Sequence, residues 1–122
     1  VPIIKVIDDV TAQQIEHSKG ATIQVLLGSD EKMPNFHTRR FAIEPGGFIP
    51  AHRHDAIEHQ QVVLEGAMVL TLDGKETLVS AGQCIYIPAK VAHSYENRGE
   101  ETVRFLCMVP VTDNYQTEWI EA

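Results

Sequence analysis

Short runs rich in apolar and β-branched residues recur along this chain, separated by clusters of polar and turn-forming residues. Runs of this length and composition are typical of β-strands. Many short strands with almost no helix indicate an all-β sandwich or barrel. The predicted strands are Ile3–Ile7, Ala21–Leu27, Phe36–Ile43, His59–Glu65, Ala67–Leu72, Glu76–Val79, Cys84–Ile87, Ser94–Asn97 and Thr102–Val109.

The segments between these runs carry their own signals. Asp73 and Gly74 stand between two alternating runs and predict a two-residue type I′ hairpin turn. The polar stretch Gly28–Asn35 predicts a loop. Only Thr11–Lys19 favours a short helix, because its first threonine can act as an N-cap and Gly20 can end it.

The length and net charge of the chain indicate how many domains it forms and which partners it can bind. A chain of 122 residues with 43% hydrophobic residues is long enough for one domain with its own core. The net charge of −7 argues against nucleic acid and anionic membranes as partners. No apolar run reaches the ~18 residues that a membrane span needs. Two cysteines are too few for a disulfide framework, so we expect a reduced, cytoplasmic protein.

Four of the six histidines form the clearest candidate for chemistry. His52 and His54 are two residues apart, His59 follows closely, and His93 comes later. In a strand, residues two apart point to the same face, so the His-x-His pair can direct two imidazoles to one point. Imidazole suits transition metals. The sequence therefore predicts one divalent transition metal per chain.

The region from Gly46 to Asn97 resembles the two motifs of the cupin family. The first motif, Gly-x5-His-x-His-x3–4-Glu-x6-Gly, is matched by Gly46, His52, His54 and Gly66. The second, Gly-x5-Pro-x-Gly-x2-His-x3-Asn, is matched by Gly82, Pro88, His93 and Asn97, with Lys90 in place of the middle glycine. The resemblance is strongest to small single-domain cupins that hold a metal with four histidines, among them manganese-binding members.

This resemblance implies a fold and an assembly. The fold is the cupin double-stranded β-helix, a jelly-roll barrel, with residues 1–122 forming a single domain. Residues 1–35 would form N-terminal strands and a loop, 36–110 the core barrel, and 111–122 a C-terminal tail. The resemblance also implies a homodimer in which N-terminal strands, drawn from apolar runs within 1–35, are added to the partner's sheet and cover its edge.

The third metal ligand has two candidates. The glutamate position of the first motif falls on Glu58 when counted from His54, and on His59 when counted back from Gly66. The two side chains point to opposite faces of a strand, so only one can face the metal. The spacing back from Gly66 favours His59 as the third ligand. The predicted metal ligands are therefore His52, His54, His59 and His93. The resemblance favours manganese or iron as the metal, with nickel, copper, zinc and cobalt as alternatives.

Several further residues are candidates for the pocket wall. Phe105 and Cys107 share one face of their strand, and Tyr95 has the same parity as His93. Gln61 could bind a water beside the metal, and Arg39 or Arg40 could pair with a substrate carboxylate. The candidate catalytic residues are Arg39, Gln61, Tyr95, Phe105 and Cys107. Each also has an ordinary structural interpretation as core, hydrogen-bonded or solvated-edge residue.

The predicted function is that of a metal-dependent enzyme acting on a small molecule. A mononuclear oxygenase or dioxygenase-like site that binds a bidentate, oxygenated and anionic substrate is the leading hypothesis. The alternatives are a lyase or isomerase that uses the metal as a Lewis acid, and a non-catalytic module that binds a metal or small ligand. Because cupins include all three, fold alone does not choose among them.

Overall fold

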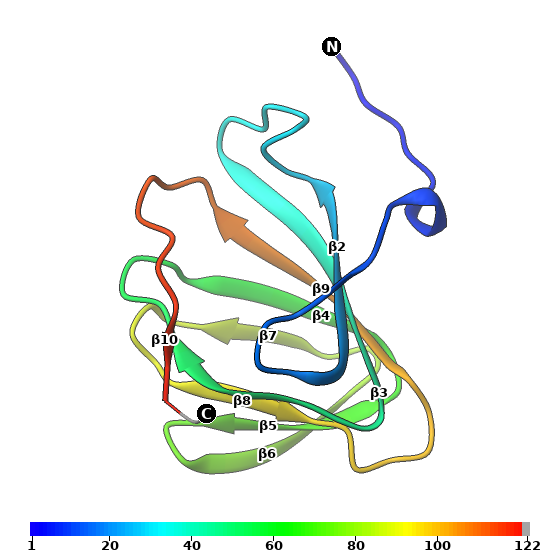
Figure 1. The fold of residues 1–122 in the computed structure, drawn as a ribbon, viewed down its shortest axis with the longest axis vertical. Helices are drawn as coiled ribbons and strands as arrows, with labels where there is room; N and C mark the ends of the chain where they lie inside the picture. The colour runs from blue at the N-terminus through cyan, green and yellow to red at the C-terminus, as the bar shows by residue number, and fades with distance from the viewer. Residues whose placement is uncertain (121–122) are drawn as a thin grey trace.

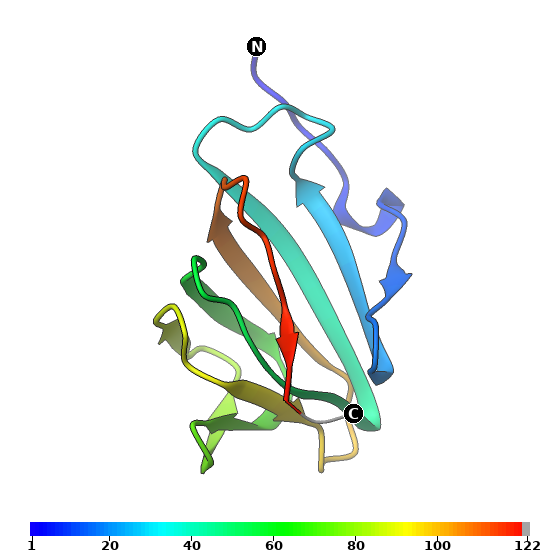
Figure 2. The ribbon, with the colours of Figure 1, turned by 60° about the vertical axis from the view of Figure 1, so that its left-hand side comes forward.

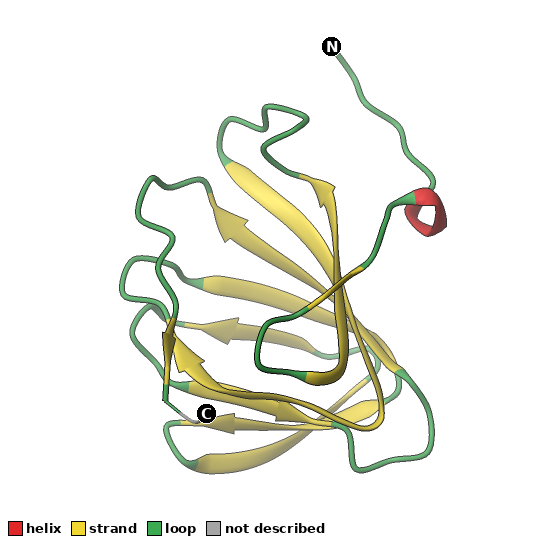
Figure 3. Ribbon diagram, viewed as in Figure 1, coloured by secondary structure: helices red, strands yellow, loops and turns green. Residues whose placement is uncertain are grey.

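The computed structural model describes residues 1–120 as an antiparallel sheet that curls into a half-open barrel (Figures 1 and 3). This architecture confirms the predicted all-β class. One short 3-10 helix, η1 (Ile7–Asp9), precedes the strands. The strands are β1 (Gln13–Gln14), β2 (Lys19–Leu27), β3 (Phe36–Arg53), β4 (His59–Glu65), β5 (Ala67–Leu72), β6 (Lys75–Ser80), β7 (Cys84–Ile87), β8 (His93–Glu96), β9 (Val103–Pro110) and β10 (Glu118–Trp119).

Strand β3 joins the two walls of the curl. Its first half pairs with β2 on one edge and β9 on the other, while its second half pairs with β8 and β10. In the strand order β6-β5-β8-β3-β9-β4-β7, β3 lies between the two walls. The sheet curls where β3 bends, which can be followed in Figure 2. Strands from both ends of the chain thus surround one interior.

Two glycines allow β3 to bend between its halves. Gly46 has a φ of +79°, which only glycine adopts without strain. At Gly47, a Cβ atom would lie 2.7 Å from the carbonyl oxygen of Lys19 on the neighbouring strand. The glycine pair is therefore required where β2 and β3 approach each other, and the bend directs the second half of β3 toward the open end of the curl.

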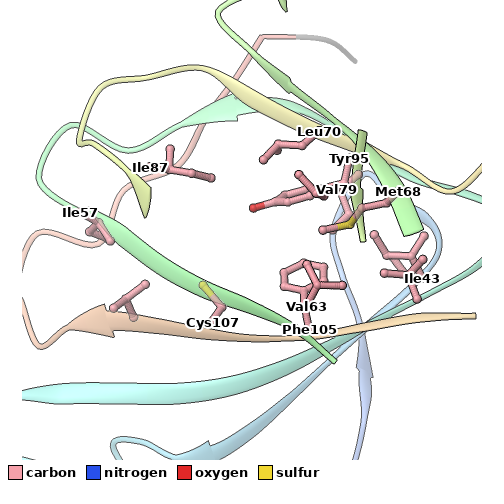
Figure 4. Close-up of a cluster of buried hydrophobic side chains, with 14 residues drawn as sticks. Ile43, Ile57, Val63, Met68, Leu70, Val79, Ile87, Tyr95, Phe105 and Cys107 are labelled. Atoms are coloured by element: carbon pink, nitrogen blue, oxygen red, sulfur yellow. The ribbon is translucent and has the colours of Figure 1, made fainter. Parts of the chain in front are cut away.

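The hydrophobic core fills the inside of the curl (Figure 4). On β9, Val103, Phe105, Cys107 and Val109 are all buried, while the residues between them are half-buried. This confirms the predicted inward face. Phe105 of β9 stacks on Tyr95 of β8 with ring centroids 5.2 Å apart, so the buried side chains of these two strands are in contact.

Most strand predictions are confirmed to within a few residues, with one large extension. The predicted strand Phe36–Ile43 continues through the glycine bend to Arg53. The turn after β5 has positive φ at both Asp73 and Gly74, as a type I′ hairpin requires. The segment Gly28–Asn35 is the predicted loop.

Two predicted elements in the N-terminal part are wrong. Thr11–Lys19 is not a helix: Gln13–Gln14 pairs with β2 and the chain then turns back. Positive φ values at His17 and Gly20 shape this reversal, and pairing with β2 outweighs the local capping signal. The predicted strand Ile3–Ile7 is an extended, largely exposed segment ending in η1, because no described strand pairs with it through a backbone ladder. Within residues 1–120, no helix is long and apolar enough to span a bilayer.

Asn97, the last residue of the second motif, ties three backbone segments together. Its buried Nδ2 donates hydrogen bonds to the carbonyls of Ile43 (2.9 Å) and Glu101 (2.8 Å). Its Oδ1 accepts a hydrogen bond from the backbone of Gly99 (3.0 Å). The side chain therefore connects the bend of β3 to the loop between β8 and β9.

We expect Asn97→Ala to lower the free energy of unfolding by about 2–4 kcal/mol, because it leaves buried backbone groups without partners. Chemical denaturation of the metal-free protein measures this loss. The exposed loop residue provides the control, since Asn35→Ala should change stability by less than about 0.5 kcal/mol. Equal stability of the two variants would contradict this role for Asn97.

Candidate metal centre

The four predicted histidines meet at the open end of the curl. His52 lies near the end of β3 and His54 directly after it, whereas His59 begins β4 and His93 begins β8. All four side chains are buried. The rings of His52 and His93 are 4.2 Å apart, and His59 lies 5.1 Å from His54 and 5.0 Å from His93. Three separate strands thus bring four imidazoles to one place.

Backbone carbonyls fix the orientation of three of these rings. Nδ1 of His52 lies 2.8 Å from the oxygen of Pro50, and Nδ1 of His93 lies 3.0 Å from that of Val91. Nδ1 of His54 lies 3.1 Å from the oxygen of Gln116. Because a carbonyl can only accept, each Nδ1 carries the proton and each Nε2 keeps a free lone pair.

This arrangement fits a transition metal. One nitrogen from each of His52, His54 and His93 lies within 4.8 Å of the others. A second hydrogen bond that holds the other ring nitrogen is the usual support of a metal-binding histidine. These three residues can therefore hold a divalent ion, and the structure supports a three-histidine metal site.

The structure places His59, not Glu58, beside this trio. The His59 ring lies in the cavity, and its buried Nδ1 has no hydrogen-bond partner among the described residues. Glu58 is exposed, and its carboxylate accepts a hydrogen bond from the Tyr86 hydroxyl at 3.0 Å. The bend between β3 and β4 therefore turns His59 toward the cavity and Glu58 toward solvent, as the spacing back from Gly66 indicates.

Burial keeps these imidazoles neutral. Loss of solvent is the main cause and neighbouring positive charge adds to it; together they lower the pKa of His52 to about 4, that of His93 to about 3 and that of His59 to about 2. The pKa of His54 is also lowered, mainly by burial. All four rings are thus in the unprotonated form that binds a metal near neutral pH.

A cavity of about 230 Å³ lies over the histidines. Four of the five candidate catalytic residues line it: Arg39, Gln61, Tyr95 and Cys107. Phe105 does not, because it is enclosed in the core between Phe41 and Tyr95, so its predicted place in the pocket wall is wrong. Phe41 occupies that position on the wall instead.

The polar lining residues form one hydrogen-bonded network. Gln61 Nε2 donates to the Tyr95 hydroxyl at 2.7 Å and to the Cys107 sulfur at 3.4 Å. Arg39 Nη2 donates to the same sulfur at 3.2 Å. Arg40 lies on the opposite face of β3, where it bonds to Gln24 and Asp8. The network thus crosses β3, β9, β4 and β8 and presents polar atoms to the cavity.

The C-terminal segment places two aromatic rings and one backbone carbonyl beside the histidines. Side-chain spacing in the sequence does not predict these contacts. Trp119 pairs with His52 in the β3–β10 register, and its ring lies 4.9 Å from the imidazole. The Tyr115 ring lies 5.3 Å from that of His54. The segment runs beside the end of β3 in Figure 2. The Gln116 carbonyl, which orients His54, is a backbone group and therefore has no signature in the sequence.

Comparison with known proteins identifies this region with one family. The family described as the cupin domain matches residues 39–109, which include all four histidines. The match therefore covers the strands that carry the candidate site, together with most of the core.

Three individual proteins illustrate the similarity. The uncharacterized protein MJ1618 of Methanocaldococcus jannaschii is 37% identical over 71 residues, which are 57% of this chain and 57% of that protein. The oxalate-binding protein of Thermotoga maritima is 27% identical over 107 residues, or 83% of this chain and 88% of that protein. The solved structure of the polyketide cyclase RemF from Streptomyces resistomycificus has a TM-score of 0.91 at 27% identity, covering 100% of this chain and 87% of that one. The chain thus spans little more than half of the archaeal relative.

Proposed function

We propose, because the chain belongs to the cupin family, that it is a metal-dependent enzyme acting on a small oxygen-bearing molecule. His52, His54 and His93, joined by His59, would hold one divalent transition metal. Bound there, the ion would act as a Lewis acid on a carbonyl oxygen of the substrate. The observation that carries this proposal is the set of three carbonyl-oriented imidazoles that faces a cavity with polar residues.

The favoured reaction is a rearrangement of an enolisable carbonyl compound, such as a cyclisation or isomerisation. The full-length likeness to a polyketide cyclase supports this class. In the cavity, Tyr95 accepts a hydrogen bond from Gln61, so its own hydroxyl proton is free to be donated to a substrate oxygen. Tyr115 and Trp119 cover one side and would exclude water from the bound substrate.

A dioxygenase is the second candidate. Manganese and iron, the metals that the family resemblance favours, are redox-active, and iron in particular is suited to imidazole ligands. Apolar Phe41 and Ile49 line the cavity beside the histidines and would accommodate dioxygen next to a substrate. Both candidates use the same four histidines and differ in their need for oxygen.

Metal analysis and parallel anaerobic assays test the proposal. Protein purified without a histidine tag should contain close to one divalent transition metal per chain, and stripping the metal should abolish turnover. A panel of β-dicarbonyls, oxo acids and catechols should be assayed with and without oxygen. Turnover in both conditions supports the rearrangement, and turnover only with oxygen supports the dioxygenase. Metal-bound protein that converts no member of the panel would favour a non-catalytic binding module.

We also propose that the active form is a homodimer. Ile4 is 97% exposed and Val6 is 63% exposed in the N-terminal segment, which projects from the sheet (Figure 1). A partner's sheet edge would cover these apolar side chains. Light scattering at micromolar concentration should give twice the mass of the chain, and Ile4→Asp should give the monomer. A monomeric wild-type protein would refute the dimer.

A further inference from the structure

Arg39 carries a buried positive charge that no described carboxylate neutralises. Only 8% of the residue is exposed, and it forms no salt bridge with residues in the range 1–120. The guanidinium donates to the Tyr115 hydroxyl at 2.8 Å and to the Cys107 sulfur at 3.2 Å, and both acceptors are uncharged when protonated. Its Nε is buried without a partner. Arginine cannot escape this cost by losing its proton.

The surroundings of Arg39 orient the guanidinium as a binding group. Its Cζ atom lies 5.3 Å from the Phe41 ring centroid and 5.9 Å from that of Tyr115. Two aromatic rings beside a planar guanidinium restrict its rotation. Its nitrogen atoms therefore stay directed along the cavity wall rather than into solvent, and the fork matches two oxygens of a planar anion.

Glu16, the carboxylate among the residues that line this cavity, is exposed and forms no salt bridge with Arg39. The nearby histidines are neutral, and the positive charge of Arg39 itself contributes to their lowered pKa values. A metal held by neutral imidazoles would keep its full double charge. With Arg39 and a bound metal, the buried part of this cavity would be positive although the chain as a whole is acidic, and it would attract a small anion.

We propose that Arg39 is the anion-binding residue of the site and that the substrate is a small oxo acid or dicarboxylate. This inference rests on the proposed function and assigns its substrate class. The carboxylate would bind the guanidinium, including the unpartnered Nε, while the second oxygen group would face the histidines. Arg39 and the histidines line the same cavity of about 230 Å³, so one small molecule can contact both.

Calorimetric titration with oxalate, a small planar dianion, tests this assignment, with neutral oxamide as the matched ligand control. Metal-free wild-type protein should bind oxalate but not oxamide. Arg39→Met should weaken oxalate binding by about tenfold to a hundredfold, because charge-assisted hydrogen bonds are lost. Arg39→Lys should retain part of the affinity. Arg40→Met is the matched protein control and should bind oxalate as wild type does, because Arg40 faces Gln24 on the other side of the strand.

Two results would overturn the assignment: unchanged oxalate affinity in Arg39→Met, or no oxalate binding by folded wild-type protein with and without metal. If Arg39→Met does not fold, the comparison of wild type with Arg39→Lys decides, because oxalate should raise the melting temperature of the wild type more. The metal-free titration also separates this inference from the proposed function. Oxalate binding through Arg39 in a protein that takes up no divalent metal, either as purified or after incubation with metal salts, would support the anion site and refute the metal enzyme.

Discussion

Replacing His59 by alanine should lower the affinity for a divalent transition metal by about a hundredfold or more. Loss of a hydrogen-bonding partner that merely supports a ligand costs about tenfold to a hundredfold, so loss of a ligand should cost at least as much. His59 is the informative position because it stands outside the trio whose nitrogens lie within 4.8 Å. Competition with a chromophoric chelator measures the affinity.

Two controls make this prediction specific. Glu58→Gln changes the other candidate third ligand and should leave the affinity unchanged, because its carboxylate lies outside the cavity on Tyr86. His37→Ala removes a histidine that does not line the cavity over the metal centre and should also have no effect. Wild-type affinity in His59→Ala would show that the trio alone holds the metal. Weakened binding in Glu58→Gln would restore the carboxylate as a ligand.

Lowering the pH from 7 to 5 should strongly destabilise the metal-free protein. His52, His59 and His93 have pKa values of about 4, 2 and 3 when folded, against about 6.5 when unfolded. The unfolded chain therefore binds more protons below pH 6.5, and stability falls as the pH falls. Each such histidine costs about 2 kcal/mol at pH 5, from 1.36 kcal/mol per pH unit. Three together approach the whole stability of a domain, about 5–15 kcal/mol.

Denaturation curves at several pH values measure this loss, and the pH window identifies its cause. The carboxyl groups with lowered pKa, Glu31, Glu76 and Glu118, sit in exposed ion pairs and would act only below about pH 4.5. Saturating metal should shift the loss of stability to lower pH, because metal binds only the folded, unprotonated site tightly. Constant stability of the metal-free protein between pH 7 and 5 would refute burial as the reason for the neutral histidines.

Side-chain periodicity predicted the parts of this protein in which strands alternate regularly. The inward face of β9 follows from the two-residue period, and His54, one residue past the end of β3, keeps the direction of His52 that this period predicts. The position of His59 followed from its distance to Gly66, because β4 runs unbroken between them. These positions depend on local geometry alone, so sequence spacing is sufficient to place them.

The predictions that were wrong or incomplete concern residues whose structure depends on contacts between segments far apart in the sequence. Thr11–Lys19 has a local helix signal, but its pairing with β2 decides the structure. Phe105 has the parity of a lining residue, yet it stacks on Phe41 of β3, and Phe41 rather than Phe105 lines the cavity. Spacing alone allows Arg39 or Arg40 to pair with a substrate carboxylate, whereas the register of β3 with β9 places Arg39, the candidate catalytic residue of the two, opposite Cys107. Only the paired sheet can supply this information.

The pairing of β3 with strands that follow it also determines when the metal centre can form during biosynthesis. His52, His54 and His59 leave the ribosome close together, so a nascent chain could capture an ion loosely. The tight site needs His93 from β8 and the Gln116 carbonyl beside β10, which are translated much later. A metal held by all four histidines would therefore bind after the chain has folded, and the ions available in its compartment at that moment would compete for the site.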